Sequence, residues 1–457
     1  MTHGRITTVN MAHAIDTIFA PATAPGRAGV AVIRISGPKA ADALAALCPD
    51  QPRPTPRMAH LRALYHPASG ALIDHALVLY FAAPASFTGE NVVELHIHGG
   101  RAILQALTQA LTALPGLRLA EAGEFTKQAF LNGKMDLTAA EGIADLIDAE
   151  TEAQRKQALR MVAGELEQAY ERYRTRLIRS LALVEAYIDF PDEDIPDHVL
   201  DELQEEVGTL REELQAALAD DHRGERIADG VHVVILGAPN AGKSTLMNYL
   251  AKRDVSIVST TAGTTRDVVE VHLDINGYPV IIADTAGLRD SEDEIELEGI
   301  RRARARTQTA DLKLAVFDAT AYPDLDQQTR DSINHNALII LNKTDQLSVA
   351  LPDTIEGHTP LAISLKTGDG LDAFMVQLEE KISGLLFSAN QPIITRARHR
   401  VAMENCVAHL QRFANGGPIE LMAEELRIAA HALGSITGRV DVEEVLGEIF
   451  RSFCIGK

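Results

Sequence analysis

The sequence predicts an α/β multidomain protein, in which a doubly wound parallel-sheet domain is inserted into an all-α bundle and preceded by an α+β domain. Three observations support this. Short apolar strands alternate with helical segments between residues 230 and 386, which is typical of a parallel sheet covered by helices. Helical spacing of apolar residues dominates on both sides of that region. The first 132 of the 457 residues mix both patterns.

The first region, residues 1–132, carries three strand-like segments and one amphipathic helix. The strands are expected at 29–36, 75–81 and 91–98. The helix is expected over 99–114, because Pro115 and Gly116 cannot continue it. We therefore predict an α+β domain at the start of the chain.

The second region, residues 133–229, is helical. Apolar residues three or four positions apart form two stripes, one over 166–188 that ends at Pro191 and one over 203–218. Helices with a single apolar stripe need partners, which predicts a bundle. The chain is helical again after residue 390, so we expect 387–457 to complete the same bundle.

The third region, residues 230–386, would then be the insertion. Strands are predicted at 231–237, 278–284, 313–318, 337–342 and 360–364. Asn276 and Gly277 lie between two strand patterns, which indicates a tight hairpin turn.

Composition narrows the class of protein. The net charge of −21 argues against generic binding to polyanions, which requires a basic surface. Three widely spaced cysteines form no disulfide framework, as in a reducing compartment. The sequence has no signal-peptide core and no apolar run of membrane-spanning length, so we expect a cytoplasmic location and no membrane contact.

A phosphate-binding loop is predicted at residues 237–245, GAPNAGKST, which fit G-x-x-x-x-G-K-[ST] between a predicted strand and a predicted helix. Gly237 and Gly242 allow successive backbone N–H groups to face phosphate oxygens. Lys243 would neutralise the β- and γ-phosphates, and the Ser244 hydroxyl would bind Mg²⁺. The helix N-terminus adds partial positive charge.

Four further segments occur in order: TAGTTRD (261–267), DTAG (284–287), NKTD (342–345) and SLK (364–366). With the phosphate-binding loop, they resemble the GTPases among P-loop proteins. The resemblance implies that Asp345 accepts two hydrogen bonds from guanine, that Asp284 supports Mg²⁺ through water, and that the Gly287 N–H senses the γ-phosphate. We therefore expect GTP, and not ATP, as the ligand. The expected GTP-binding residues are Asn240, Ala241, Gly242, Lys243, Ser244, Thr245, Ser259, Thr260, Thr261, Ala262, Gly263, Thr264, Thr265, Asp284, Thr285, Ala286, Gly287, Asn342, Lys343, Asp345, Ser364 and Lys366.

Leu288 departs from this class, because Ras-like enzymes place a water-orienting glutamine there. Leucine cannot position water. Either hydrolysis is negligible, or a monovalent cation near Asn240 and residues 259–265 and a carboxylate within 290–299 do the work.

Five longer segments narrow the resemblance to one family. Residues 16–37, 86–100, 121–137, 185–193 and the terminal FCIGK (453–457) resemble the MnmE (TrmE) family of tRNA-modification GTPases, from Asp16 to Lys457. The resemblance implies a homodimer, an N-terminal tetrahydrofolate-binding domain and a K⁺ ion in each G domain. It also implies a heterotetramer with MnmG (GidA), a partner that uses FAD and NADH. Together they would add an aminomethyl or carboxymethylaminomethyl group to carbon five of the tRNA wobble uridine, with the one-carbon unit drawn from a tetrahydrofolate.

The same resemblance assigns individual residues. The implied folate contacts are Arg34, Glu94, Lys134 and Lys457; the K⁺ ligands are Asn240, Ser259, Thr261 and Thr264; and the Mg²⁺ ligands are Ser244 and Thr265. The implied catalytic groups are Glu296, Lys243 and Asp284. Two interpretations of Cys454 stay open, a reactive thiol near the transferred carbon and a small packing residue.

Other interpretations are weighed against this one. A regulatory GTPase switch of the ribosome-assembly type would use the flanking domains only for partner binding, and Leu288 permits a non-hydrolysing scaffold. The arginines of 172–179 and 301–306 are candidate tRNA contacts, although solvated helix faces are the more ordinary explanation. We expect no shared metal at His96 and His98, on the view that they point to opposite faces of a strand.

Overall fold

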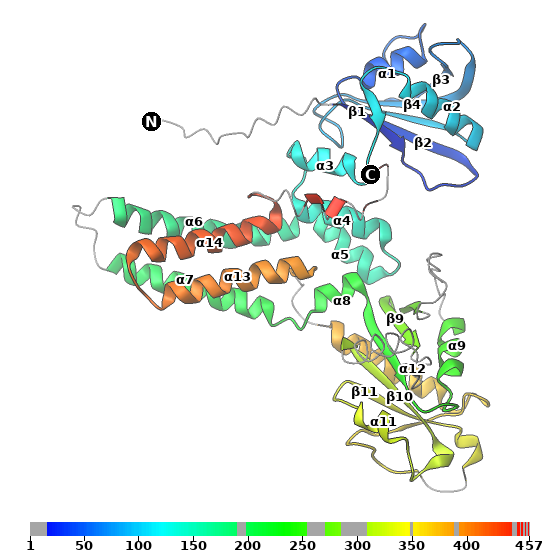
Figure 1. The fold of residues 1–457 in the computed structure, drawn as a ribbon, viewed down its shortest axis with the longest axis vertical. Coiled ribbons are helices and arrows are strands. Elements are labelled where there is room, and N and C mark those ends of the chain that lie inside the picture. The colour runs from blue at the N-terminus through cyan, green and yellow to red at the C-terminus, as the bar shows by residue number, and fades with distance from the viewer. Residues whose placement is uncertain are drawn as a thin grey trace, which may run out of the picture. The chain divides into compact units, whose positions relative to one another are not determined.

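The computed structural model describes residues 16–189, 198–253, 270–284, 309–347, 351–387 and 393–440, together with Leu446, Gly447, Ile449, Phe450, Phe453 and Gly456. The chain forms two compact units, one of residues 1–144 with 437–457 and the other of residues 145–436 (Figure 1). The predicted fold class is confirmed: a mixed N-terminal sheet, a helical bundle and a largely parallel sheet follow one another. The predicted domain boundaries at 132, 229 and 386 stay predictions.

The N-terminal sheet has six strands in the order β3-β4-β5-β2-β1-β6. Its strands are β1 Thr17–Pro21, β2 Ala28–Ser36, β3 His60–Tyr65, β4 Leu72–Phe81, β5 Val92–Gly99 and β6 Leu117–Leu119. Alternate residues such as Ile33, Ile35 and Leu95 pack against α1 (Ala40–Leu47) and α2 (Arg101–Thr112). The predicted strands and helix of this region are confirmed. The intervening strand residues, including Arg34 and Glu94, point away from this core.

Helix α3 (Glu124–Leu131) contributes Phe125 to a second, smaller cluster with Ile18 and Ala20. The end of the chain belongs to the same unit. Phe450 and Phe453 pack against Leu137 at the start of α4 (Leu137–Asp148). A Cβ on Gly456 would lie 2.0 Å from the Pro21 carbonyl oxygen, so the chain end passes directly against β1.

The bundle consists of α5 (Glu152–Val162), α6 (Glu165–Asp189), α7 (His198–Leu218), α13 (Ala397–Ala414) and α14 (Ile419–Thr437). Both predicted apolar stripes lie in its core, together with residues of α13 and α14 such as Cys406 and Leu433. Burial raises the pKa of the Cys406 thiol to about 12. Helices α13 and α14 pack in this core as expected, whereas residues 437–457 belong to the other compact unit, so the assignment of all of 387–457 to the bundle stays a prediction.

The second sheet has the order β12-β11-β10-β7-β9-β8, and its strands are parallel except for β8. Its elements are β7 Val231–Leu236, α9 Lys243–Arg253, β8 Glu270–Ile275, β9 Tyr278–Asp284, β10 Leu312–Asp318, α11 Gln327–Asp331, β11 Ala337–Asn342, β12 Leu361–Ala362 and α12 Leu371–Leu386. All five predicted strands are confirmed. The predicted hairpin turn is also confirmed, because Asn276 (φ 53°) and Gly277 (φ 84°) adopt the left-handed backbone that such a turn needs. The chain reverses its direction of winding at β7. Sheets of this kind bind ligands outside the carboxyl ends of the strands next to such a reversal.

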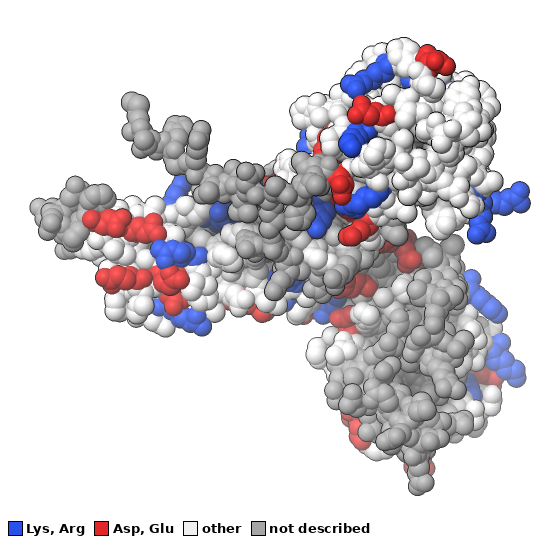
Figure 2. Space-filling view, turned by 45° about the horizontal axis from the view of Figure 1, so that its top comes forward, with Lys and Arg blue, Asp and Glu red and all other residues white. Residues whose placement is uncertain are grey.

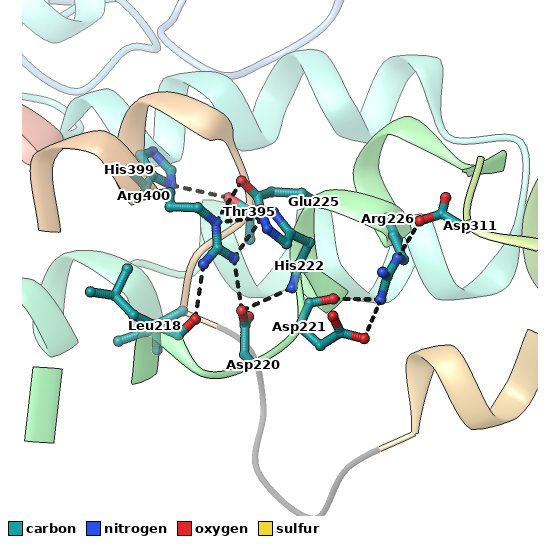
Figure 3. Close-up of polar contacts among 12 residues, drawn as sticks. Leu218, Asp220, Asp221, His222, Glu225, Arg226, Asp311, Thr395, His399 and Arg400 are labelled. Carbon is teal, nitrogen blue, oxygen red and sulfur yellow. Dashed lines mark hydrogen bonds and ion pairs between the residues drawn. The ribbon is translucent and has the colours of Figure 1, made fainter. Parts of the chain in front are cut away.

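The short helix α8 (Arg223–Asp229) joins the bundle to β7, and Arg400 of α13 holds it in place (Figure 3). Arg400 Nε donates to both carboxylate oxygens of Glu225, at 3.1 and 2.9 Å, and Nη2 donates to Asp220 at 2.8 Å. Arg226 reaches forward to Asp311 at 2.7 Å. Where the chain returns, the Tyr170 hydroxyl donates to the Ile393 carbonyl at 2.6 Å.

Candidate functional site

The phosphate-binding loop has the expected strand–loop–helix form, with Gly237 following β7 and Lys243 opening α9. Asn240 (φ 64°) and Gly242 (φ 112°) have left-handed backbone. A Cβ on Gly242 would lie 2.3 Å from Asn342 Nδ2, so a larger residue would displace that side chain. Lys243 Nζ donates to the carbonyls of Gly237 at 2.7 Å and Ala238 at 3.0 Å, which holds the ammonium group over the loop. The loop therefore presents an ammonium group and a helix N-terminus to an anion.

Asn342 joins this loop to the two segments expected to recognise the base. Its buried side chain donates from Nδ2 to the Ala241 carbonyl at 2.8 Å and accepts at Oδ1 from the Leu365 backbone N–H at 3.1 Å. One amide thus fixes the P-loop, the end of β11 and the SLK segment in relation to one another.

The Asp345 carboxylate is oriented by Ser364. The Ser364 hydroxyl, fully buried, donates to Asp345 Oδ1 at 2.7 Å and accepts from the Thr367 N–H at 3.1 Å. The Thr344 hydroxyl donates to the Ile363 carbonyl at 2.9 Å, which adds a second link between the two segments. A carboxylate aligned in this way is suited to accept paired hydrogen bonds from a base.

Lys343 is held by a residue that sequence reasoning missed. Its backbone is left-handed (φ 68°), and its Nζ lies 2.6 Å from Asp318 Oδ2 at the end of β10. Asp318 Oδ1 accepts from the Thr320 N–H at 3.0 Å and from its hydroxyl at 2.7 Å. Burial raises the pKa of Asp318, but these bonds and the Lys343 charge outweigh it and leave the pKa below its usual value. Asp318 pairs with Asn342 in the β10–β11 register, which is a property of the folded sheet and not of either segment alone.

A second cluster of predicted residues lies on the N-terminal sheet. Arg34 on β2 and Glu94 on β5 are direct cross-strand partners, with Arg34 Nε and Nη2 at 3.1 and 3.0 Å from Glu94 Oε1. The guanidinium lies 5.6 Å from the ring centre of Phe87 and 5.7 Å from that of Phe125. We call Arg34, Glu94, Phe87 and Phe125 the Arg34 cluster. A charged pair beside aromatic rings is suited to a flat, polar heterocycle.

Lys134 is linked to the Arg34 cluster through residues 84–90. Its Nζ donates to the Pro84 carbonyl at 3.0 Å, and Phe87 of the same segment faces Arg34. Ser36 and Glu90 extend the polar surroundings, since the Ser36 hydroxyl donates to Glu90 Oε2 at 3.2 Å. Burial raises the pKa of Glu90. Glu90 was not predicted, although SFTGE lies inside a segment that carries the family resemblance.

The expectation about His96 and His98 rests on a wrong argument. Residues two apart in a strand share a face, and here each histidine meets its own carboxylate: His96 lies 3.6 Å from Glu94 and His98 lies 2.8 Å from Asp74. No group of three or more potential ligand side chains that could hold a metal ion occurs among the described residues.

The arginines of α6 are partly engaged in ion pairs. Arg176 lies 2.6 Å from Glu206 and 2.7 Å from Glu213, and Arg174 lies 3.5 Å from Glu171. The face of the molecule in Figure 2 likewise shows acidic and basic side chains interspersed. Mixed charge of this kind favours the interpretation as a solvated helix face.

Family models cover almost all of the chain. The model described as MnmE helical domain matches residues 137–454, and the model described as GTP-binding protein TrmE N-terminus matches residues 17–134. The chain belongs to the MnmE (TrmE) family.

Curated MnmE relatives match over nearly the whole length. A protein of Paramagnetospirillum magneticum named tRNA modification GTPase MnmE is 54% identical over 97% of this chain and 100% of its own length. A protein of the same name from Rhodospirillum rubrum is 51% identical over the same shares. Among solved structures, the G domain of the T. maritima FeoB iron transporter is 24% identical over 34% of this chain and 99% of that chain. Its TM-score of 0.26 is too low to support a conclusion.

Most of the remaining predicted site residues lie outside the described ranges, and Asp284 lies within them. Asp284 ends β9 opposite Ile235 of β7, next to the P-loop. The other predicted residues lie outside the described part of the chain: Ser259, Thr260, Thr261, Ala262, Gly263, Thr264, Thr265, Thr285, Ala286, Gly287, Leu288, Glu296, Cys454, Lys457 and the arginines of 301–306. Every helix in the described ranges is too short or too polar to span a lipid bilayer.

Proposed function

We propose that this chain is a GTP-hydrolysing enzyme of tRNA modification. The observation that carries the proposal is the link made by Asn342, which joins a phosphate-binding loop to a carboxylate suited to guanine. Relatives about half identical over 97% of the chain are named tRNA modification GTPases, which supports the same conclusion.

In this proposal, Mg²⁺ is bound by Ser244 and Thr265 and supported by Asp284. Ser244 fits because it is exposed in the first turn of α9, directly after Lys243. K⁺ is bound by Asn240, Ser259, Thr261 and Thr264. Asn240 fits because it is exposed in the loop and offers an amide oxygen, a ligand that hard cations accept. The two cations would supply positive charge beside the phosphates, where Lys243 already acts.

Glu296 is proposed to orient the attacking water, since Leu288 cannot. Lys243 and Asp284 complete the catalytic set: Lys243 would stabilise charge on the phosphates, and Asp284 would support Mg²⁺ through water. This assignment makes the chain a hydrolase and not a non-hydrolysing scaffold.

The Arg34 cluster is proposed to bind a tetrahydrofolate that carries the one-carbon unit. Glu94 would pair with the donor edge of the pterin, and the exposed ring of Phe87 would pack on its face. Lys134 and Lys457 would hold the anionic tail. The fit rests on the Arg34–Glu94 pair beside Phe87 and Phe125. Gly456 against β1 is compatible with Lys457 reaching the same unit.

The proposed product is tRNA carrying an aminomethyl or carboxymethylaminomethyl group at carbon five of the wobble uridine. We propose that the chain acts in the cytoplasm as a homodimer, in a heterotetramer with the partner MnmG, which supplies FAD and NADH. The acidic net charge of −21 is consistent with a partner that contributes much of the tRNA affinity.

The test of the nucleotide assignment exchanges the carboxylate that reads the base. Asp345→Asn replaces an acceptor by an amide whose NH₂ group donates, which suits the 2-carbonyl of xanthine and not the 2-amino group of guanine. We expect GTP turnover in K⁺ to fall at least about 100-fold and XTP turnover to appear, as expected where buried polar groups are left unpaired. Wild-type turnover of ATP equal to that of GTP would overturn the assignment.

The test of the modification is the analysis of wobble nucleosides by mass spectrometry after deletion of the gene. The modified uridines should disappear, and the wild-type gene should restore them, whereas Asp345→Asn should not. Unchanged nucleosides in the deletion strain, together with GTP hydrolysis by the purified wild-type protein, would favour the regulatory switch.

A further inference from the structure

The ends of β10 and β11 carry a charged pair, Asp318 and Lys343, in which Asp318 has no role in the proposed chemistry. Asp318 and Asn342 are register partners on these parallel strands, and Lys343 follows Asn342 directly. Lys343 Nζ and Asp318 Oδ2 are 2.6 Å apart, and both side chains are about 70% buried, with exposed fractions of 30% and 27%.

The backbone at Lys343 adopts an unusual conformation. Its φ of 68° is left-handed, a conformation that residues with a side chain rarely adopt. Here it turns the chain from β11 into the short 3₁₀ helix Thr344–Gln346, which carries Asp345. A side-chain contact that holds Lys343 therefore also holds the turn that aims Asp345.

Asp318 is well placed to supply that contact. Its Oδ1 accepts hydrogen bonds from the N–H and hydroxyl of Thr320. These bonds fix the orientation of the carboxylate independently of Lys343. The Lys343 contact and the bonds from Thr320 favour the ionised carboxylate, since they lower the pKa of Asp318 against the effect of burial.

We propose that Asp318 is a positioning residue for guanine recognition, which holds Lys343 and thereby the left-handed turn that presents Asp345 to the base. The inference rests on the proposed GTP site. Asp318 does not touch the nucleotide; it acts through Lys343 on Asp345.

A merely structural role is the competing explanation, since Asp318 also caps the 3₁₀ helix Ala319–Ala321 through Thr320. Asp318→Asn separates the two roles: the amide oxygen still accepts from Thr320, but the charge facing Lys343 is gone. Asp326→Asn is the matched control. Asp326 caps α11 in the same way, accepting from the Thr329 N–H at 2.8 Å.

The experiment measures the dissociation constants of GDP, IDP and ADP for the full chain and both variants. IDP lacks the 2-amino group, so the ratio of its dissociation constant to that of GDP reports the alignment of Asp345. Asp318→Asn should weaken GDP binding about tenfold, equivalent to about 1.4 kcal/mol, and weaken IDP binding less. Asp326→Asn should leave all three constants within about twofold.

A double-mutant cycle with Lys343→Ala tests whether Asp318 acts through the lysine. In that background Asp318→Asn should weaken GDP binding no further. Unchanged GDP binding in Asp318→Asn, or an equal loss in the Lys343→Ala background, would overturn the inference. If the wild type bound GDP no more tightly than ADP, the proposed GTP site would fail instead, which is a separate result.

Discussion

Two arginine–carboxylate contacts, one in each unit of the molecule, involve the same types of residue but differ in burial and in their number of partners. Arg34 lies beside Glu94, and both of its contacts reach one carboxylate oxygen. Arg400 donates from three nitrogens to Glu225, Asp220 and the Leu218 carbonyl (Figure 3). The exposed fraction of the Arg400 side chain is 10%, against 22% for Arg34.

The difference separates a contact that builds the fold from one suited to a ligand. A buried guanidinium whose three nitrogens already donate within the protein has little free surface for a ligand. Its carboxylate partners depend on it for charge compensation. The half-buried Arg34–Glu94 pair lies next to the exposed ring of Phe87 and retains surface on which another molecule can pack. Burial and the number of partners, and not residue type, thus distinguish the two.

The sharpest test of this contrast removes the Arg400 charge. Arg400→Met removes the guanidinium from the largely buried Glu225 and Asp220 carboxylates and leaves His222, 2.8 Å from Glu225, as the remaining ring partner. The free energy of unfolding should therefore fall by about 3–5 kcal/mol. Urea unfolding followed by circular dichroism measures this. Arg427→Met is the control, because Arg427 pairs with Glu185 and Glu424 in solvent and its loss should leave the midpoint unchanged.

Adding Glu225→Gln to Arg400→Met should restore part of the loss, since one uncompensated charge disappears. If the double variant were less stable than Arg400→Met, the buried-charge explanation would be wrong.

A smaller effect, on binding and not on stability, is expected at Arg34. Arg34→Gln removes the cation beside Glu94 and should weaken tetrahydrofolate binding about tenfold, as expected for one charged hydrogen bond. Isothermal titration calorimetry measures the affinity, and thermal unfolding should change little. Arg53→Gln serves as the control, since Arg53 also lies over an aromatic ring, 5.7 Å from the centre of Tyr80. Equal losses of affinity in both variants would show that Arg34 has no specific role in tetrahydrofolate binding.

The smallest effect concerns pH. Burial raises the pKa of Glu90, so the ionised form is disfavoured in the folded state. Its contribution to stability is therefore fully present below the unfolded-state pKa, about 4.3, and is lost as pH rises through the raised value. Glu90→Gln should match the wild type in thermal midpoint near pH 4 and exceed it by up to about 3 °C at pH 7. A difference that is the same at both pH values would show that ionisation is not the cause.

Much of the fold followed from local pattern. The apolar stripes of α6 and α7, the strands of the second sheet and the turn at Asn276 and Gly277 were all predicted, because period and turn chemistry are properties of short segments. β1, β3 and β6 were missed. β6 has only three residues and is defined by its pairing with β1 across about 100 positions, so no local pattern marks it.

The candidate site divides in the same way. Gly242, Asn342, Asp345 and Ser364 were predicted from motifs whose spacing reflects their chemistry, and the structure brings them together. Asp318 was missed because its role depends on the neighbouring strand. Arg400 was missed because Glu225 lies 175 positions away. Contacts between distant segments need the fold before they can be recognised.

The contact between Arg400 and Glu225 also determines where the chain leaves and re-enters the bundle. Glu225 stands just before the chain leaves the bundle for the second sheet, and Arg400 stands just after the chain comes back. Because these two residues are in contact, residues 230–396, between α8 and α13, leave the bundle and re-enter it at neighbouring points. Replacing that whole stretch with a short peptide linker should leave the fold of the bundle intact, as expected for a domain inserted between two neighbouring chain ends.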